Sequence, residues 1–297
     1  MKGIILAGGT GSRLYPLTLI QSKQLLPVYN KPMIYYPLST LISCGIQEIL
    51  IITNREYIDA YKTLLGNGND FGINITYAIQ EKPLGIAQAL QIARDYIFDE
   101  CCTLILGDNI FIGSNVVEYL KQAFLSAYSG KASLFLKNVE NPTSFGVATL
   151  DVDGNITKIE EKPQTTNSNL AVTGLYVYPK GAVKYVNDLI PSSRGELEIT
   201  DLNRVYLNNG KVIGYTLSDD VVWFDAGTTD NLLDASIYIR QQEEKIGEMI
   251  GCPEVCAIRN HWLATNKLDK VLEKYKNDKR VDTLRHTFMM ESKKYVI

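Results

Sequence analysis

Apolar residues in the N-terminal third of the chain fall into short runs, which alternate with longer segments of helical spacing. The short runs are rich in β-branched residues and bounded by turn residues, which is typical of buried strands. We predict strands at 3–7, 48–53, 73–79 and 103–106, and helices at about 33–44, 57–65 and 86–97. This alternation predicts βαβ units, hence a largely parallel sheet with helices on both faces.

From about Ala132 the pattern changes to strands with hairpin signals. We predict strands at 146–151, 156–160 and 171–178, with a turn at Asp153-Gly154-Asn155. Helical patterns follow at about 181–189, 198–207 and 231–246, and small amphipathic helices from Pro253 with a polar break at 276–279. Because we find no repeat or low-complexity linker, we expect one α/β domain over residues 1–252, with a mixed, mainly parallel central sheet. A helical C-terminal extension, residues 253–297, is expected to pack on it.

Composition narrows the class of protein. The 297 residues are 45% hydrophobic and 21% charged, with a net charge of −3, so nothing favours general attraction to nucleic acid or anionic lipid. Apolar runs stay shorter than the roughly 18 residues of a membrane span, and the start of the chain predicts a strand rather than a secretion signal. We therefore expect a cytoplasmic protein with no nucleic-acid or membrane partner.

Cysteine and histidine usage narrows the chemistry. The five cysteines form no Cys-x-x-Cys pair, which favours buried reduced thiols over disulfides or a zinc site. Both histidines, His261 and His286, are far from the conspicuous motifs, so a histidine-based triad is disfavoured. We expect chemistry based on carboxylates, cations and a metal.

A glycine loop follows the first predicted strand and predicts a polyphosphate site. Gly8, Gly9 and Gly11 allow successive backbone N–H groups to face one anion, and Arg13 and Lys23 supply positive charge. The loop has neither the third glycine of a dinucleotide-binding fingerprint nor the Gly-Lys-Ser/Thr ending of a P-loop. A simple glycine-rich turn is the alternative, but Lys23 and the adjacent Gln24 favour a substrate-binding site.

Two aspartates each follow an apolar run and predict a metal site. Asp108 ends a buried strand, where a carboxylate requires a metal ion or a hydrogen-bond donor. Asp225 repeats this arrangement before Ala226-Gly227. Each aspartate alone is more often a helix N-cap or turn residue, whereas the pair suits Mg²⁺ together with phosphate oxygens.

Further polar residues at predicted strand ends have two interpretations each. Glu161 and Lys162 form either a solvated charge cluster or a site for sugar hydroxyls and a sugar phosphate. Gln80 has an amide that suits a pyrimidine edge, although surface glutamines usually bind nothing. The motif Arg194–Asp201 is equally well explained as a turn with a helix start.

Together these motifs resemble those of the sugar nucleotidyltransferases, over essentially the whole chain. The glycine loop and Glu161-Lys162-Pro163 mark the superfamily. The motif Ser22-Lys23-Gln24-Leu25-Leu26-Pro27, followed by Lys31-Pro32-Met33-Ile34-Tyr35-Tyr36, is similar to the branch of glucose-1-phosphate thymidylyltransferases. The resemblance implies a single Rossmann-like α/β domain, usually assembled as a homotetramer, with C-terminal helices that help form a second, regulatory nucleotide site.

The resemblance also implies roles for residues at matching positions, with dTTP and glucose 1-phosphate as the ligands. It places the triphosphate on Gly8, Gly11, Arg13 and Lys23, and Mg²⁺ on Asp108 and Asp225. It places thymine at Gln80 and Gly85. It places glucose at Gly146, Glu161, Val172 and Trp223, with the sugar phosphate on Lys162. As catalytic residues we expect Arg13, Lys23, Asp108 and Lys162.

The sequence departs from the family pattern at three places. Phe145 replaces an expected tyrosine near the sugar, and Leu84 places an apolar residue beside the expected base site. Ser218-Asp219-Asp220 lies where relatives often have an arginine for the regulatory ligand, although Arg259 suits that site.

These features favour one function over several alternatives. We expect in-line transfer of deoxythymidylate from dTTP to glucose 1-phosphate, giving dTDP-glucose for a pathway such as dTDP-rhamnose biosynthesis. A UTP-preferring enzyme is the nearest alternative, because uracil differs from thymine by one methyl group. A catalytically silent nucleotide-sugar sensor is disfavoured by five charged residues of the expected kind. A glycosyltransferase is disfavoured because Gly107-Asp108-Asn109 has one carboxylate instead of a pair.

Overall fold

The first strand, β1 (Lys2–Ala7), lies inside the sheet in the computed structural model, which describes residues 1–263, 265–278 and 280–293. Its apolar run is almost wholly buried, as expected of a strand covered on both faces. In sheet order the neighbouring strands are β10 (Ile156–Glu161), β9 (Gly146–Leu150), β11 (Leu170–Tyr178), β6 (Cys102–Leu106), β1, β4 (Glu48–Thr53) and β5 (Asn74–Ile79). β8 (Ala132–Asn138) pairs with β11 and with β12 (Val212–Thr216).

Strand directions divide the sheet into two parts. β6, β1, β4 and β5 are parallel, whereas β11 is antiparallel to β6 and begins the antiparallel part with β8, β9 and β10. β12 runs parallel to β8 at the edge. The hairpin between β9 and β10 turns at Asp151, whose side chain accepts hydrogen bonds from the backbone N–H groups of Asp153 and Asn155. The predicted mixed α/β sheet is confirmed.

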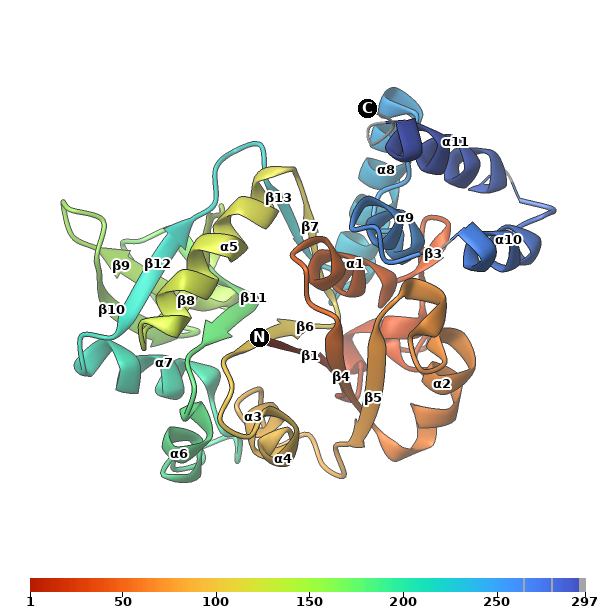
Figure 1. Ribbon diagram of the computed structural model, residues 1–297. Coiled ribbons are helices and arrows are strands. Elements are labelled where there is room, and N and C mark those ends of the chain that lie inside the picture. The colour runs from red at the N-terminus through yellow and green to blue at the C-terminus, as the bar shows by residue number, and fades with distance from the viewer. Residues whose placement is uncertain (264, 279, 294–297) are drawn as a thin grey trace.

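Helices cover both faces of the sheet (Figure 1). On one face lie α1 (Tyr35–Ser43), α2 (Ile58–Leu65) and α5 (Asn115–Tyr128), whose apolar residues pack with Ile5, Ile51 and Ile105. On the other face lie α3 (Gln88–Ile92), α4 (Arg94–Ile97), α6 (Ala182–Asn187) and α7 (Ile199–Asn208), which pack with Ile4 and Leu104. Successive residues of β1 therefore belong to opposite cores, as strand alternation requires.

Two short ladders lie beside the main sheet. β2 (Pro27–Val28) and β3 (Lys31–Pro32) form a small hairpin after the glycine loop. β7 (Asn109–Ile112) and β13 (Val222–Asp225) pair antiparallel, so Asp225 lies opposite Asn109. This second ladder brings a late segment of the chain to the end of β6.

Single-turn 3₁₀ segments complete the description, at η1 (Ser12–Leu14), η2 (Lys23–Leu25), η3 (Arg55–Tyr57), η4 (Asn69–Phe71) and η5 (Pro142–Ser144). After β13 the chain forms the long helix α8 (Thr229–Ile246), whose start is capped by the Thr228 hydroxyl accepting from the Asn231 N–H. The last helices are α9 (Pro253–Arg259), α10 (Thr265–Lys274) and α11 (Arg280–Lys293).

The C-terminal helices pack on the N-terminal half through α9 and α1. Asn260 donates to the Ile42 carbonyl at 2.5 Å, and the Ser43 hydroxyl donates to the Cys256 sulfur at 3.1 Å. The predicted polar break is a turn at 275–278, while its last residue, Lys279, and residues 294–297 lie outside the described residues. The division at residue 252 stays a prediction.

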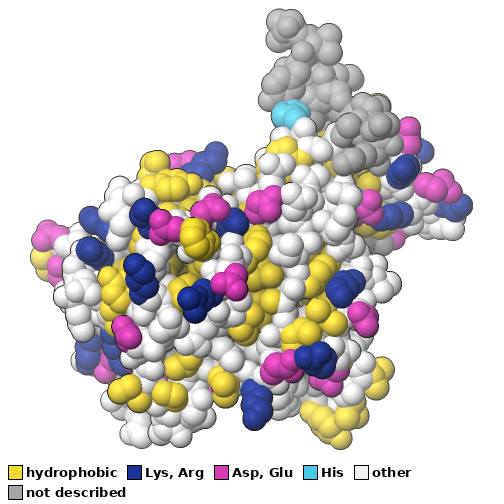
Figure 2. All heavy atoms as spheres, turned by 60° about the horizontal axis from the view of Figure 1, so that its bottom comes forward, with side chains coloured by type: hydrophobic (Ala, Val, Ile, Leu, Met, Phe, Trp, Pro, Cys, Tyr) yellow, Lys and Arg dark blue, Asp and Glu magenta, His cyan; other side chains and the backbone are white. Residues whose placement is uncertain are grey.

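Charged side chains of both signs are mixed on the surface of the protein. On the face in Figure 2, Lys and Arg alternate with Asp and Glu, and hydrophobic side chains lie between them. Within the described part of the chain, no helix combines the length and apolar character that crossing a bilayer requires. The five cysteines are free thiols, four of them buried.

Candidate active site

The glycine loop leaves the end of β1 and lies against Gln80 at the end of β5. A side chain at Gly8 would collide with the Gln80 amide, so glycine allows this close approach. Asn54 donates to the Gly9 carbonyl at 3.0 Å and fixes the loop from the neighbouring strand end. The ends of β1, β4 and β5 thus contribute to one edge, as expected for parallel strands.

Asp108 is buried directly after β6 and has two donors. Lys23 forms an ion pair with one carboxylate oxygen, and the Asn109 amide donates to the other at 3.1 Å. Burial alone would raise the pKa of Asp108, but the charge and hydrogen bond of Lys23, with Asn109, hold it below its ordinary value. Asp108 is therefore ionised at neutral pH despite its burial.

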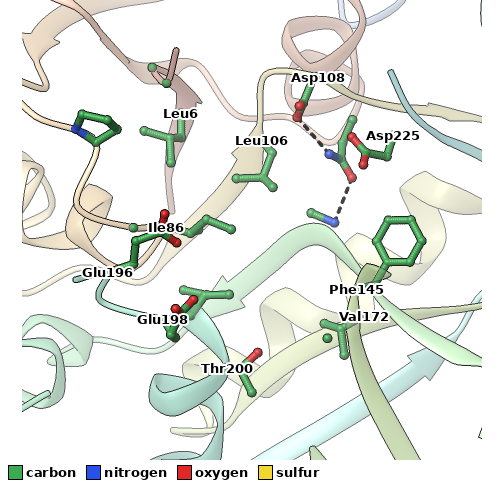
Figure 3. Close-up of a pocket in the computed structure, with 18 of the residues that line it drawn as sticks. Leu6, Ile86, Leu106, Asp108, Phe145, Val172, Glu196, Glu198, Thr200 and Asp225 are labelled. Carbon is green, nitrogen blue, oxygen red and sulfur yellow. Dashed lines mark hydrogen bonds between the residues drawn. The ribbon is translucent and has the colours of Figure 1, made fainter. Parts of the chain in front are cut away.

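Asp225 is brought beside Asp108 by the β7–β13 ladder. The Ala226 N–H donates to the Asp108 carbonyl at 2.9 Å, which joins the two segments. Burial, and then the charge of Asp108, raise the pKa of Asp225 to about 6, against the opposing charges of Lys23, Arg13 and Lys162. Both aspartates line the same cavity (Figure 3).

Two more cations, Arg13 and Lys162, act on the pKa of Asp225 and have side chains that are about half exposed or more. The Arg13 guanidinium is 3.9 Å from Asp225, and its side chain is 60% exposed. Lys162 follows β10 with a positive φ of 40°, which is uncommon for a residue with a side chain. Its half-exposed ammonium is 3.9 Å from Glu161. Both cations are accessible to an anionic ligand.

Carboxylates and hydroxyls line the wall formed by β10 and the start of α7. Glu161 accepts from the Thr200 hydroxyl at 2.5 Å, and Arg194 approaches Glu161 at 3.4 Å. Arg194 also donates to both oxygens of the buried Glu198 at 2.9 Å. The sequence of the segment Arg194–Asp201 is equally consistent with a turn and with a site; in the structure Arg194, Glu196, Glu198, Ile199 and Thr200 from this segment line the cavity.

An aromatic pair adjoins this wall, since Gly146, the residue after Phe145, pairs with Glu161 in the β9–β10 ladder. The rings of Phe145 and Trp223 are 5.1 Å apart and tilted by 59°. The Trp223 indole N–H donates to Asn109 at 2.7 Å, which fixes the ring. Gly146 and Val172 continue this wall, so it presents ring and aliphatic surface where a tyrosine would add a hydroxyl.

These walls enclose one cavity of about 380 Å³. Except for Gly11, every predicted site residue lines it: Gly8, Arg13, Lys23, Gln24, Gln80, Gly85, Asp108, Gly146, Glu161, Lys162, Val172, Trp223 and Asp225. Gly11 directly precedes η1 in a left-handed conformation, and its carbonyl accepts from the Thr18 hydroxyl at 3.0 Å. The residues predicted to be catalytic or to bind a metal therefore meet at one place.

The part of the cavity near Gln80 and Gly85 differs from expectation at Leu84. This side chain is 43% exposed and is not among the lining residues, because the loop carries it outward; Pro83 and Ile86 supply the apolar surface. Gln24 is engaged by its own chain, accepting from Ser22 at 2.8 Å.

Asn109 was not predicted as a site residue. Its carbonyl oxygen accepts from the Gly174 N–H at 2.9 Å and from Trp223, while its NH₂ group donates to Asp108 (Figure 3). The motif Gly107-Asp108-Asn109 was the available signal, because an amide after a strand-end carboxylate can satisfy both a donor and acceptors.

A second cavity, of about 420 Å³, lies between α1, the end of α8 and α9. Arg259 lines it and forms an ion pair with Glu248 at 2.6 Å. Ser218 and Asp220 are not among its lining residues, and Asp220 accepts from Asn115 at 2.7 Å.

Known proteins share these features over most of the chain. The model of the nucleotidyl transferase family matches residues 2–242. A glucose-1-phosphate thymidylyltransferase from Neisseria meningitidis is 48% identical over 91% of this chain and 93% of its own length. One from Mycolicibacterium smegmatis is 46% identical over 90% and 92%.

Solved structures agree with this similarity. A Bacillus anthracis structure in complex with a sucrose, provisionally described as a glucose-1-phosphate thymidylyltransferase, is 43% identical, with a TM-score of 0.75 over 81% of this chain and 95% of that chain. A UDP-glucose pyrophosphorylase complexed with UDP-glucose shares the fold at 23% identity, with a TM-score of 0.71 over 81% and 98%. The chain therefore belongs to the nucleotidyl transferase family and, within it, to the glucose-1-phosphate thymidylyltransferases.

Proposed function

We propose that this enzyme transfers deoxythymidylate from dTTP to glucose 1-phosphate and releases pyrophosphate. The observation that carries the proposal is the gathering of Arg13, Lys23, Lys162, Asp108 and Asp225 around one cavity. The nucleotide brings about four negative charges and the sugar phosphate about two more, so their repulsion must be offset before they meet. The cations Arg13, Lys23 and Lys162 are suited to this task.

The reaction we propose is a single in-line displacement. A phosphate oxygen of glucose 1-phosphate forms a bond to the α-phosphorus of dTTP as the bond from that phosphorus to the bridging oxygen breaks, and the electron pair leaves with pyrophosphate. The attacking oxygen is already anionic, so positioning and charge stabilisation matter more than a general base. In keeping with this, none of the described residues lining the cavity is a histidine.

Asp108 and Asp225 are suited to hold Mg²⁺. Their donors are hard carboxylate oxygens. Burial, and then the charge of Asp108, raise the pKa of Asp225, and a bound cation would offset both effects. No group of three or more acidic, histidine or cysteine side chains with metal-binding geometry occurs in the described chain, so phosphate and water oxygens would complete the shell. When bound, the ion would neutralise charge on the phosphates.

The remaining residues are assigned to the two substrates. Lys162 would bind the sugar phosphate and Glu161 the sugar hydroxyls, a role supported by its bonds to Thr200 and Arg194. Gln80 would read the thymine edge, with Gly85 beside the base. Arg13 and Lys23 would hold the triphosphate over the glycine loop.

We extend the proposal to the cellular location, the oligomeric state and the pathway, on the basis of the family to which the chain belongs. We infer a cytoplasmic homotetramer that supplies dTDP-glucose to a pathway such as dTDP-rhamnose biosynthesis.

Pyrophosphate release tests the proposal. Glucose 1-phosphate is offered with dTTP, UTP, CTP, ATP or GTP, with and without Mg²⁺. We expect release with dTTP, lower but measurable release with UTP, and loss of both without Mg²⁺. UTP use above dTTP use would make the enzyme a uridylyltransferase, and absence of release with every nucleotide would favour a nucleotide-sugar sensor.

A further inference from the structure

The side-chain amide of Gln80 lies between the cavity and the side chain of Gln88. Its NH₂ group donates to the side-chain oxygen of Gln88 at 2.8 Å, and Gln80 lines the cavity above Gly8. Gln88 lies at the start of α3 and does not line the cavity. We propose that Gln88 is a positioning residue that fixes the orientation of the Gln80 amide and so selects uracil-type bases over cytosine. This inference rests on the proposed function, in which Gln80 reads the base.

The orientation of Gln88 is determined by a backbone group. Its side-chain oxygen also accepts from the Leu84 N–H at 3.1 Å. A side-chain amide can turn by 180° with little change of shape, whereas a backbone N–H can only donate. Turning Gln88 would place its NH₂ group against the Leu84 N–H. Gln88 therefore presents oxygen, and Gln80 must present its NH₂ group to that oxygen.

Leu84 is itself held in place by the chain. Its carbonyl accepts from the Leu197 N–H at 2.7 Å, and the Ala87 N–H donates to the Leu197 carbonyl at 3.1 Å. Gly85, with a φ of 102°, lies so close to the Leu197 backbone that a side chain would collide with it. The Leu84 N–H is thus a fixed reference for both amides, even though it also approaches the Lys82 carbonyl at 2.9 Å.

This orientation matters because pyrimidines differ along one edge. Thymine and uracil present an N3–H donor and an O4 acceptor, whereas cytosine presents an N3 acceptor and an N4 donor. Held by Gln88, Gln80 can accept with its oxygen and donate with its remaining N–H, which pairs with thymine or uracil. The turned amide would pair equally well with cytosine. A glutamine that turned freely would accept both bases, so the restraint supplies the selectivity.

The test compares dUTP with dCTP, which differ only along this edge, and measures kcat/KM for each with glucose 1-phosphate. Gln88→Met and Gln88→Ala remove the acceptor, and Gln88→Glu keeps an acceptor for both Leu84 and Gln80. We expect the ratio of kcat/KM for dCTP to that for dUTP to rise about tenfold or more in Gln88→Met and Gln88→Ala. In Gln88→Glu the ratio stays near the wild-type value.

Two outcomes overturn the role of Gln88. One is a dCTP to dUTP ratio within about twofold of wild type in whichever of Gln88→Met and Gln88→Ala is folded by circular dichroism. The other is a rise of the ratio in Gln88→Glu equal to that in Gln88→Met. A wild-type enzyme that is active with dTTP, combined with either outcome, refutes Gln88 alone. A wild-type enzyme inactive with every pyrimidine nucleotide refutes the proposed function.

Discussion

At the level of single residues, the site contains carboxylates at buried positions, where burial disfavours their ionised form. Asp108 offsets its burial by pairing with Lys23, whereas Asp225 has weaker partners and faces the charge of Asp108. The ionised form of Asp225 is therefore disfavoured in the folded protein, which links stability to pH.

We predict that Asp225→Asn stabilises the metal-free protein at pH 8. The pKa of Asp225 is about 6 in the folded protein against 3.8 ordinarily, so the folded state binds more protons between these values. Stability due to this group falls as pH rises through that window, and the loss is complete above it. Removing the charge should add about 1–3 kcal/mol at pH 8.

Urea unfolding in the presence of a chelator, from pH 4 to pH 8, measures this effect. The curve should flatten for Asp225→Asn and keep its slope for the control Asp153→Asn, which alters an exposed turn residue. Added Mg²⁺ should raise the stability of the wild type but not that of Asp225→Asn. If Asp225→Asn were less stable than the wild type at pH 8, ionised Asp225 would not destabilise the folded protein.

We predict that Arg13→Ala and Lys162→Ala each lower kcat about 100-fold or more with dTTP and glucose 1-phosphate, because each removes a positioned charge from the reacting phosphates. Lys158→Ala is the matched control, since Lys158 lies on the same strand as Glu161 but outside the cavity lining. Steady-state rates of pyrophosphate release give the comparison. Near-normal turnover in both variants would remove the proposed roles.

At the level of elements, the site depends on the ladder of β7 and β13. Asn109 begins this ladder and bonds to Asp108, to the Trp223 ring and to the Gly174 N–H of β11. One amide thus joins three segments that are distant in sequence.

We predict that Asn109→Ala destabilises the fold by about 2–4 kcal/mol, because it leaves the buried Gly174 N–H and the half-buried Trp223 N–H without an acceptor. Urea unfolding at pH 8 measures the change. Asn115→Ala is the control, since Asn115 bonds only an exposed carboxylate among its described contacts. Equal losses in the two variants would mean that Asn109 does not join the elements.

A second connection between elements is the ion pair of Lys31 and Glu243, which fixes the β2–β3 hairpin to α8. The Lys31 side chain is fully buried, its ammonium is 2.7 Å from Glu243, and Glu243 also accepts from the Ile250 N–H at 2.8 Å. A buried ion pair stabilises a fold little more than apolar residues of similar volume would. Removing one partner, however, leaves a buried unpaired charge, which destabilises the fold strongly.

We predict that Lys31→Met destabilises the protein by about 3–5 kcal/mol and that the double variant Lys31→Met/Glu243→Leu is less affected than the single one. Arg55→Ala, which breaks an exposed pair with Glu81, should change stability little. Midpoints of urea unfolding order the variants. If the double variant is the least stable, the attraction between Lys31 and Glu243 contributes more to stability than the cost of one unpaired charge, which contradicts the prediction.

The elements could be predicted where periodicity acts alone. The strand 48–53 appears with its predicted bounds, because a continuous apolar run inside a parallel sheet has no competing interpretation. The helix predicted at 86–97 is instead α3 and α4, interrupted at Ala93. β13 was not predicted as a strand, because its pairing with β7 is decided by tertiary contact and not by local pattern.

At the level of the whole molecule, the cavity joins contributions from both halves of the chain. The parallel half supplies the glycine loop, Gln80 and Asp108, and the antiparallel half supplies Glu161 and Lys162. That these charged residues lie together could be predicted, because they follow predicted strand ends and their combination resembles a known family, while their roles in the reaction stay predictions. Contacts such as Thr200 to Glu161 or Gln88 to Gln80 could not, because they depend on how distant segments meet.

In the proposed reaction both phosphate esters meet in this one cavity and react without an intermediate on the enzyme. Exchange of labelled pyrophosphate into dTTP, measured with and without glucose 1-phosphate, distinguishes this reaction from a two-step route. Direct displacement predicts exchange only when glucose 1-phosphate is present, because the bond to the α-phosphorus forms only with that acceptor. Exchange with dTTP alone would reveal a covalent nucleotidyl-enzyme intermediate and would exclude direct displacement. Absence of exchange in both reactions would exclude it as well.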